Sequence, residues 1–558
     1  MESTMPNATN KSADLEVPVL IVGGSLVGLT TSLLLSSYGI SNLVVERHSS
    51  TAIHPRAASF HQRTMEIFRH AGVQPVVEAA AALDFEQNGA IVAVESLCGK
   101  ELQYFYKSWN EGVEDLSITP RVFITQVGLE PVLRKAAAEQ GADHRFGAEL
   151  MTLEQDADGV TAKIKSRDTG NVQSVRSQYL VAADGAHSTT REQLGISMEG
   201  HGSSECITIY FRADMKEMIG DRNLSVIYVL NPNLLGFFRF SLDGQSGFLS
   251  IFSVTDAATG ERRDLVADLS DERCSDYVRT ALGCAGDVPI EIDSVQRWEA
   301  SASSAERYSS GRVFLVGDAA HTMPPTGGWG GNTGVADAHN LAWKLAMVLK
   351  GVADPALLDS YDAERRPAGL MTMEQAYAIY AGRYAERATL DDKPLAVPRQ
   401  AESIELGSVY RSRAVIDPKN QTVPDDGACE VVDPRSPLTD VGSRGPHVEV
   451  IQAGEKKSIH DLFTDSYVLL AGPKGGAWRD AANALAQKES LPLDAYIVGQ
   501  NGDVTDTDQE FSKAYGLAPN GAVIVRPDGV VAWRSGNGPD DAASSVAHAI
   551  GLLLQHAS

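Results

Sequence analysis

The sequence predicts a mixed α/β and α+β protein, and three regions with different hydrophobic patterns lead to this prediction. Residues 17–22 and 43–46 are continuous apolar runs, and segment 26–38 between them has helical periodicity, which together predict a βαβ unit with a parallel sheet. Residues 205–254 alternate apolar and polar residues in short runs, as antiparallel strands do. Residues 442–558 again alternate strand-like and helix-like segments.

The chain has 558 residues, enough for about three domains at roughly 150 residues each. It carries 48 basic and 73 acidic residues, a formal net charge of −25. This acidity argues against a basic surface for nucleic acid or for anionic lipid. No apolar run approaches the roughly 20 residues that span a bilayer. We therefore expect neither nucleic acid as a partner nor insertion in a membrane.

The five cysteines are too few for a disulfide scaffold, and no two of them form a Cys-x-x-Cys pair. Their odd number favours reduced, buried thiols. Residues 1–16 are polar and lack the basic start and apolar stretch of a secretory signal. We expect a cytoplasmic protein.

The parallel-strand pattern of the first domain returns at 313–316, after the antiparallel segment. The first domain is therefore expected to be discontinuous, with the antiparallel sheet inserted in it. The expected segments are a flexible leader (1–16), the first part of the first domain with some sheet-domain elements around 85–120 (17–198), the sheet domain (199–298), the second part of the first domain with helices (299–385), a connecting segment (386–441) and a C-terminal domain (442–558).

The C-terminal domain has the order of strands and helices of a thioredoxin-like fold. Its central strand is followed by Gly-Pro-Lys-Gly-Gly-Ala-Trp at 472–478, without the Cys-x-x-Cys pair. Without a thiol to attack a disulfide this domain cannot exchange dithiols. We expect it to have a structural role.

The first βα turn reads Gly23-Gly24-Ser25-Leu26-Val27-Gly28, a Gly-x-Gly-x-x-Gly pattern with Ser25 at the second glycine. Glu46 ends the next strand, eighteen residues after Gly28. A strand, a tight turn, a helix N-terminus and a following acidic residue form the context of a Rossmann-like dinucleotide site, in which the helix attracts the pyrophosphate and the acid holds a ribose. The alternative is an ordinary βα turn without a ligand.

Two further motifs follow. Asp184-Gly-Ala-His-Ser-Thr-Thr-Arg191 contains Asp-Gly-x-x-Ser-x-x-Arg, and Gly317-Asp318 precedes a glycine-rich turn that leads into a helix expected at 335–350. In their order and spacing the three motifs resemble those of the single-component FAD-dependent aromatic hydroxylases, the class A flavoprotein monooxygenases. The tail without the cysteine pair resembles that of phenol hydroxylase and of the hydroxylases of aromatic polyketides.

The resemblance implies non-covalent FAD, with NADPH as a transient co-substrate and O2. It also implies hydroxylation of an electron-rich phenolic or polycyclic polyketide substrate through a C4a-hydroperoxyflavin, in secondary metabolism. Only one dinucleotide fingerprint is present, so NADPH is expected to bind without a Rossmann domain of its own. Baeyer-Villiger or epoxidising oxygenation, and a non-catalytic FAD-binding redox sensor, remain alternatives. The expected oligomeric state is a monomer or a homodimer.

In the family, an aspartate like Asp318 accepts a hydrogen bond from the FAD ribityl chain, although a helix N-cap is the alternative here. Arg56 resembles the arginine that neutralises the pyrophosphate. Trp329 either borders the pocket or simply packs, and His187 and His321 are expected to make local hydrogen bonds rather than bind a metal. The full set of expected cofactor residues is Gly23, Ser25, Gly28, Glu46, Arg56, Gln126, Asp184, Asp318, Pro325, Gly328, Gly330, Gly331 and Asn332.

The inserted sheet is expected to form a roof over the substrate, with Tyr210, Arg212, Tyr228 and Arg239 as candidates to orient it. By strand alternation Tyr210 and Arg212 share a face, and Arg239 lies opposite its two phenylalanine neighbours. An arginine cation would favour the phenolate form of a substrate, and a tyrosine hydroxyl could pass a proton. We expect Arg212 and Tyr228 before the others as catalytic residues, with Tyr210 third. The alternative for each is an exposed strand residue.

Overall fold

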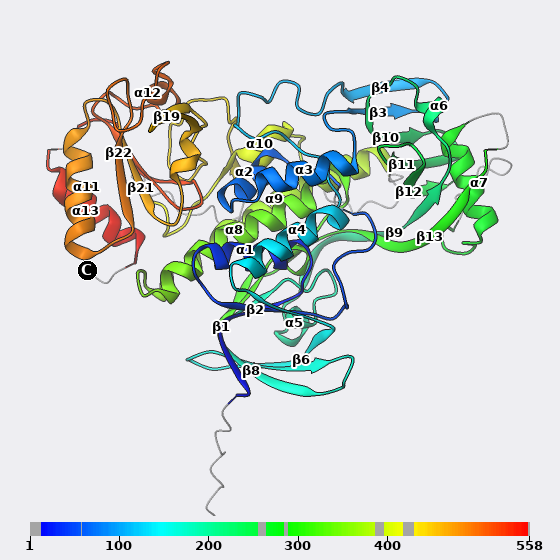
Figure 1. The fold of residues 1–558 in the computed structure, drawn as a ribbon, viewed down its shortest axis with the longest axis horizontal. Coiled ribbons are helices and arrows are strands. Elements are labelled where there is room, and N and C mark those ends of the chain that lie inside the picture. The colour runs from blue at the N-terminus through cyan, green and yellow to red at the C-terminus, as the bar shows by residue number, and fades with distance from the viewer. Residues whose placement is uncertain are drawn as a thin grey trace, which may run out of the picture.

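The computed structural model describes residues 13–56, 58–254, 264–283, 288–384, 395–416, 429–538 and 540–555. It contains two eight-stranded sheets and a smaller C-terminal sheet (Figure 1). The second sheet, in green, and the C-terminal domain, in orange and red, lie at opposite ends of the molecule (Figure 1). Two long helices, α8 (Trp329–Leu349) and α9 (Asp359–Tyr384), run between them.

The first sheet has the strand order β14-β15-β8-β1-β2-β5, with β6 and β7 joined to β8. β1 pairs in parallel with β2 and with β8, and β15 pairs in parallel with β8. The chain thus leaves this sheet after β8 and returns to it at β14 and β15, and the division into domains stays a prediction. The strands are β1 (Leu15–Val22), β2 (Asn42–Glu46), β5 (Asp143–Phe146), β6 (Ala148–Gln155), β7 (Val160–Ser166), β8 (Val172–Ala182), β14 (Ser309–Ser310) and β15 (Val313–Leu315).

The helices of this region cover the first sheet or lead to the second. Apolar side chains of β1 and of α1 pack in one core with those of α8. The helices are α1 (Leu26–Ser37), α2 (Gln62–His70), α3 (Gln74–Asp84), α4 (Gln126–Glu139), α5 (Thr189–Gln193), α6 (Lys216–Ile219), α7 (Asp271–Leu282) and α10 (Ala401–Leu406), with 3-10 turns η1 (Gly317–Ala319), η2 (Thr326–Gly328) and η3 (Pro355–Leu358).

The second sheet has the order β16-β13-β9-β12-β11-β10-β3-β4 and is antiparallel except for the pair β3–β10. Its strands β3 and β4 come from the first part of the chain. One face packs against α7 through aliphatic side chains and the other faces α9. The strands are β3 (Ala90–Val94), β4 (Glu101–Tyr106), β9 (Met198–Arg212), β10 (Leu224–Leu230), β11 (Leu234–Phe240), β12 (Ser246–Val254), β13 (Glu291–Ala305) and β16 (His321–Thr322).

Helix α8 begins at Trp329, six residues before its expected start, so the glycine-rich segment forms its first turns. Glycine is a poor helix former, by about 1 kcal/mol relative to alanine. Close packing explains the choice, because a Cβ on Gly334 would lie 2.6 Å from Val27 Cγ2 on α1. The contact with α1 therefore decides where α8 begins.

The C-terminal sheet has the order β22-β21-β23-β24, with α11 and α13 beside it. The predicted alternation of elements is found, and the likeness to thioredoxin stays a prediction. The first strand of this region, β19, lies outside this sheet and pairs with β20, with one further bridge from Ile451 to Thr505. The elements are β19 (Glu449–Gln452), β20 (Glu455–Ser458), η5 (Ile459–Leu462), β21 (Tyr467–Ala471), α11 (Gly476–Glu489), β22 (Leu493–Ile497), α12 (Glu510–Ala514), β23 (Ala522–Val525), β24 (Val531–Ser535) and α13 (Ala542–Leu553).

Cys206, Cys274 and Cys429 are buried, and Cys274 and Cys429 are free thiols, as expected. Cys98 is disulfide-bonded, so the expectation of reduced thiols is wrong for this residue, and Cys284 lies outside the described residues. Among the described residues, no helix is long and apolar enough to cross a membrane. The expected domain boundaries stay a prediction. The segment 386–441, expected to be a connection, contains α10 and the short pair β17 (Ser408–Val409) and β18 (Glu430–Val431).

Candidate active site

The turn between β1 and α1 requires glycine at both of its ends. Gly23 has a φ of 107°, and a Cβ there would lie 2.1 Å from the Ala183 carbonyl oxygen. A Cβ on Gly28 would lie 1.9 Å from the Gly23 carbonyl oxygen. The turn therefore brings the N-terminus of α1 against the carboxyl ends of β1 and β8, where helix amides attract anions.

A carboxylate that the sequence analysis did not single out lies at this helix N-terminus. Glu130 of α4 is fully buried, and its Oε1 accepts hydrogen bonds from Ser25 Oγ (2.5 Å) and from the Leu26 amide (3.0 Å). Gln126, one helical turn earlier, donates to Ser25 Oγ at 3.3 Å. Burial raises the pKa of Glu130 above its usual value. The four-residue spacing of Gln126 and Glu130 was the available signal, because it places both on one helix face.

Glu46 ends β2 as predicted, and its carboxylate is oriented by the backbone. Oε2 accepts from the Gly24 amide at 2.7 Å and Oε1 accepts from the His48 amide at 2.8 Å. Each oxygen keeps a second lone pair for a further donor. The side chain is thus fixed beside the turn in a position to accept hydrogen bonds from a pair of hydroxyl groups.

Asp318 and Arg56 differ from the other charged residues of this region because both are exposed and neither is paired. No hydrogen bond or ion pair joins either side chain to the described part of the chain. The surrounding protein keeps part of the solvent away from the Asp318 carboxyl group and so raises its pKa, while His321 and Arg56 oppose that rise. An acceptor and a cation left open at the end of a buried strand fit a ligand with hydroxyl and phosphate groups, as FAD has.

The backbone beneath Asp318 is held by a buried cluster around Asp337 of α8. Asp337 Oδ2 accepts from the Gly317 amide at 3.0 Å and lies 2.6 Å from His321 Nε2. Arg365 Nε donates to Asp337 Oδ1 at 2.7 Å. His321 is therefore a local hydrogen-bonding residue, as expected. Within the described ranges no group of three or more potential ligands could hold a metal ion.

Asp184 does not project an open carboxylate toward the cofactor residues. Its oxygens accept from Ser188 Oγ (2.5 Å) and from the amide and hydroxyl of Thr190 (3.0 and 2.8 Å), which closes the N-terminus of α5. Arg191 of the same motif donates to the Ala319 carbonyl at 3.1 Å, beside Asp318. This motif therefore supports the Gly317-Asp318 segment from behind.

The turn before α8 contains two consecutive residues with positive φ, Gly327 (80°) and Gly328 (67°), just after Pro325. A Cβ on Gly328 would lie 2.5 Å from Ser59 Oγ. Asn332 serves this turn with its side chain, because Nδ2 donates to the carbonyls of Gly328 (2.7 Å) and Ser59 (3.0 Å). Only backbone groups of Gly330, Gly331 and Asn332 are therefore left to contact a flavin.

Trp329 packs, which is one of its two expected alternatives. Its side chain is 4% exposed and lies in an apolar cluster with Ala376 of α9 and Ile404 of α10. Its indole nitrogen has no hydrogen-bond partner.

One face of the second sheet carries a row of polar and aromatic side chains. Residues paired across antiparallel strands share a face, and the register gives the row Gln296, Thr208, Ser250, Phe237 and Tyr228. Phe252 of this face meets Tyr380 of α9 edge to face, with 5.7 Å between ring centroids. The face is thus a wall of rings opposite the end of α9.

Tyr228 is paired with a cation that comes from α9. The Arg383 guanidinium lies 5.0 Å from the centre of the Tyr228 ring and 4.4 Å from that of Phe105. Burial raises the pKa of Tyr228, and the charge and hydrogen bond of Arg383 oppose the rise. At neutral pH the hydroxyl is therefore protonated and lies beside a positive charge.

Comparison with known proteins decides what these elements form together. Residues 16–376 match the FAD binding domain family, and residues 438–554 match the family of aromatic-ring hydroxylase C-terminal domains. The chain belongs to the FAD-dependent aromatic-ring hydroxylases. FAD is therefore its cofactor, and the enzyme is a monooxygenase.

Relatives of this hydroxylase match it over nearly its whole length. A 4-methyl-5-nitrocatechol 5-monooxygenase of a Burkholderia species is 46% identical over 97% of this chain and 98% of the relative. An aklavinone 12-hydroxylase of Streptomyces purpurascens is 38% identical over 96% of this chain and 98% of the relative. The crystal structure of aklavinone-11 hydroxylase with FAD and aklavinone matches with a TM-score of 0.88 and 37% identity, over 98% of this chain and all of the other.

In this hydroxylase Arg212 does not join the aromatic wall. It lies at the end of β9, where its side chain is 62% exposed and forms a 3.1 Å ion pair with Asp293. Strand alternation gave its face correctly but not the fact that the strand runs past the edge of the wall. The expectation that Arg212 orients the substrate is therefore corrected by its position.

Tyr210 and Arg239 lie on the face of the wall, since both register with Phe248. Tyr210 donates a hydrogen bond to the Pro55 carbonyl at 3.2 Å, next to the loop that carries Arg56. Arg239 is buried between the rings of Phe85 and Phe123, at 3.8 and 4.7 Å from their centres. Both residues thus connect the sheet with the FAD-binding domain.

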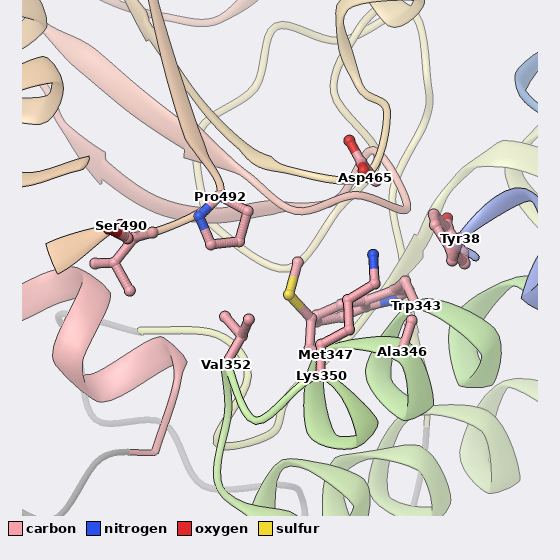
Figure 2. A pocket seen from close by; sticks show the side chains of 10 residues that line it. Tyr38, Trp343, Ala346, Met347, Lys350, Val352, Asp465, Ser490 and Pro492 are labelled. Atoms are coloured by element: carbon pink, nitrogen blue, oxygen red, sulfur yellow. The ribbon is translucent and has the colours of Figure 1, made fainter. Parts of the chain in front are cut away.

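A hollow of about 300 Å³ lies elsewhere in the hydroxylase, between the C-terminal half of α8 and the C-terminal domain (Figure 2). Trp343 and Met347 of α8, with Lys350 just after the helix, face Asp465 and Pro492 across it. None of the expected cofactor or substrate residues lines this hollow. It is therefore separate from the candidate active site.

Proposed function

We propose that this hydroxylase inserts oxygen into an electron-rich aromatic ring, a phenol or a polycyclic phenol, with FAD, NADPH and O2. The observation that carries the proposal is the wall of aromatic side chains with Tyr228 and Arg383 at one end. The named activities of the relatives, on a nitrocatechol and on polycyclic polyketides, support the same substrate class. We further propose that the enzyme works in the cytoplasm, as a monomer or homodimer, without nucleic acid.

The residues of the first domain fit the parts of FAD. Ser25 and the N-terminus of α1, with Arg56, would hold the pyrophosphate, and Glu46 would accept hydrogen bonds from the adenosine ribose. Asp318 would accept from the ribityl chain. The amides after Gly328 would face the flavin ring, where negative charge collects on reduction. When bound and reduced by NADPH, FAD supplies activated oxygen.

The chain's own contribution to the reaction is to activate the substrate and exclude water. A phenolic hydroxyl beside Tyr228 would lie within the field of Arg383, and a nearby cation favours the phenolate form, which is the more nucleophilic ring. The Tyr228 hydroxyl can hand on the displaced proton through a hydrogen bond. The rings of Phe237, Phe252 and Tyr380 keep this end of the site apolar.

The test compares Tyr228→Phe and Arg383→Met with Arg212→Met as the matched arginine control. General acid-base contributions are typically about 10²- to 10⁴-fold. We therefore expect product formed per NADPH oxidised to fall at least tenfold in one of the first two variants, with hydrogen peroxide released instead and FAD still bound. Arg212→Met should match the wild-type protein. The assignment fails if coupling falls only in the Arg212 variant or in none.

The substrate class is tested separately, by offering simple phenols, nitrocatechols, anthrones and anthraquinones with NADPH and identifying products by mass spectrometry. Products that carry one additional oxygen on a phenolic ring support the proposal. NADPH oxidation without an oxygenated product from any of these compounds contradicts it.

A further inference from the structure

The turn Gly327–Gly328 is supported from behind by His61, a residue outside all three sequence motifs. A Cβ on Gly328 would lie 3.8 Å from His61 Nε2, and the Gly327 carbonyl acts to raise the pKa of the His61 ring. The His61 amide donates to Asn332 Oδ1 at 2.9 Å. His61 therefore contacts the turn and the first turn of α8 at the same time.

The imidazole of His61 lies beside a buried ion pair between distant parts of the chain. His61 Nδ1 lies 3.7 Å from Oε1 of Glu405, which comes from α10. Arg121 binds Glu405 through Nε (3.2 Å) and Nη2 (3.0 and 3.1 Å), and both side chains are at most 1% exposed. Arg121 also stacks over the Trp109 ring at 4.7 Å. Separating the two side chains would leave each as an unpaired charge in the protein interior, which costs several kcal/mol.

Among the described groups that face this cluster, Glu405 is the one whose pKa lies near neutrality. Burial raises the pKa of Glu405 to about 7, with a smaller contribution from Glu402, against the opposing charge of Arg121. Burial and Arg121 lower the pKa of His61 to about 3, so its ring is neutral. Burial also raises the pKa of Tyr106 on β4, which keeps it protonated. The other charged groups lining the hollow around His61 and Glu405 are the guanidiniums of Arg63, Arg365 and Arg444.

We propose that Glu405 is a positioning residue for FAD, whose carboxylate balances Arg121 and fixes the His61 ring against the Gly327–Gly328 turn. The proposal rests on the placement of the flavin at this turn that is proposed above. When Glu405 is ionised, Arg121 has a charged acceptor, and the His61 ring packs beside this pair. When Glu405 is protonated, Arg121 is a buried cation without a partner, and the cluster must rearrange. The backbone amides after Gly328, which would face the flavin ring, would then be held less firmly.

The test measures the dissociation constant of FAD from the full-length protein, by recovery of free flavin fluorescence, between pH 6 and 8.5. In the wild-type protein we expect affinity to fall about tenfold as the pH drops through 7, because the ionised Glu405 is lost. Glu405→Gln has the shape of the protonated residue. It should bind FAD about tenfold more weakly than the wild-type protein at pH 8.5 and show no change with pH. A merely structural role would not remove the pH dependence.

Glu402→Gln is the matched control, because Glu402 lies one turn away on α10 and forms no ion pair with the described residues. It should keep the wild-type affinity at pH 8.5 and the fall of affinity with pH, with the midpoint moved to a slightly lower pH because the Glu402 charge contributes to the raised pKa of Glu405. Wild-type behaviour of Glu405→Gln overturns the proposal, as does a pH-independent affinity of the wild-type protein, which can be measured even if the variant does not fold. Gly328→Ala tests whether the flavin lies at this turn, independently of the role of Glu405. If it leaves FAD affinity unchanged, the placement of the flavin is at fault rather than the role of Glu405.

Discussion

Charged side chains gather in two regions of this molecule, and the two regions treat them in opposite ways. The first region, which we call the seam, is the contact of α8 and α9 with the C-terminal domain. Here Glu364 of α9 binds Arg526 at 2.6 Å and Lys344 of α8 at 2.9 Å. Arg526 also binds Asp528 at 2.5 Å, and all four side chains are at most 3% exposed. At the carboxyl ends of the first sheet, Asp318 and Arg56 are exposed, and their side chains have no hydrogen-bond or ion-pair partner among the described residues.

This difference in pairing indicates that the charges of the seam stabilise the fold, whereas the unpaired charges of the cleft bind a ligand. A buried charge without a partner costs several kcal/mol, so the seam exists only because each of its ions has an opposite ion. An exposed charge at the end of a parallel strand can stay unpaired and serve a ligand instead. The comparison predicts that changes at the seam affect folding, whereas changes in the cofactor cleft affect FAD and leave folding unchanged.

The largest effect is expected from Glu364→Ala at the seam. The variant removes the Glu364 charge that pairs with Lys344 and leaves Arg526 with Asp528 alone, and breaking a buried pair from one side typically costs about 3 to 5 kcal/mol. The free energy of unfolding, from urea titration followed by tryptophan fluorescence, should fall by that amount. Glu489→Ala is the control, since its pair with Lys488 is exposed and should contribute less than about 1 kcal/mol. Equal stability of the two variants would refute the architectural role of the seam.

The pH dependence of the seam follows from the same contacts. Burial acts to raise the pKa of Glu364, but the charges of Arg526 and Lys344 hold this pKa well below its usual value. A carboxyl group with a lowered pKa stabilises the folded state above its unfolded pKa, and this contribution is lost as the pH falls toward the folded value. The seam should therefore make the wild-type protein lose stability in acid more steeply than Glu364→Ala does.

The second effect in size concerns the cleft. Asp318→Ala removes a charged acceptor that no protein group uses, so the free energy of unfolding of the FAD-free protein should stay within about 0.5 kcal/mol of the wild-type value. FAD should bind about 10- to 100-fold more weakly, because a hydrogen bond to a charged group contributes about 1.5 to 3 kcal/mol. Arg56→Ala should weaken FAD less, since its guanidinium is exposed. Identical FAD affinities of the two variants would refute this order.

The sequence allowed the cleft to be predicted because its parts are local. Gly23 to Gly28, Glu46 and Gly317-Asp318 each follow a buried strand, and the carboxyl ends of parallel strands meet at one edge of a sheet. The groups that support the cleft were not predictable in this way. Glu405 reaches it from α10, at a sequence distance for which no spacing rule exists, and the signal for Glu130 of α4 was limited to its four-residue spacing from Gln126.

The sheet shows a different limit of the sequence. Alternation correctly placed Tyr210 and Tyr228 on strands of the sheet domain, but it did not show how far along a strand the site extends. Arg212 therefore looked equivalent to Tyr210, although it lies past the edge of the wall. The cation that does lie beside Tyr228 is Arg383 of α9, and its proximity depends on packing between a helix and a sheet that are far apart in sequence.

The smallest effect is expected at the rim of the seam, where Arg69 of α2 binds Asp461 through two hydrogen bonds of 2.6 and 2.9 Å. The Arg69 side chain is 34% exposed, so water screens this pair more than it screens Glu364 and Arg526. Arg69→Met keeps the aliphatic stem and leaves Asp461 to cap the 3-10 turn η5 through the Ser458 amide. We expect a loss of about 0.5 to 1 kcal/mol in the free energy of unfolding, which disappears in 1 M salt because an exposed pair is screened. A loss as large as that of Glu364→Ala, or one independent of salt, would mean that the whole seam acts as one network and that burial does not rank its ion pairs.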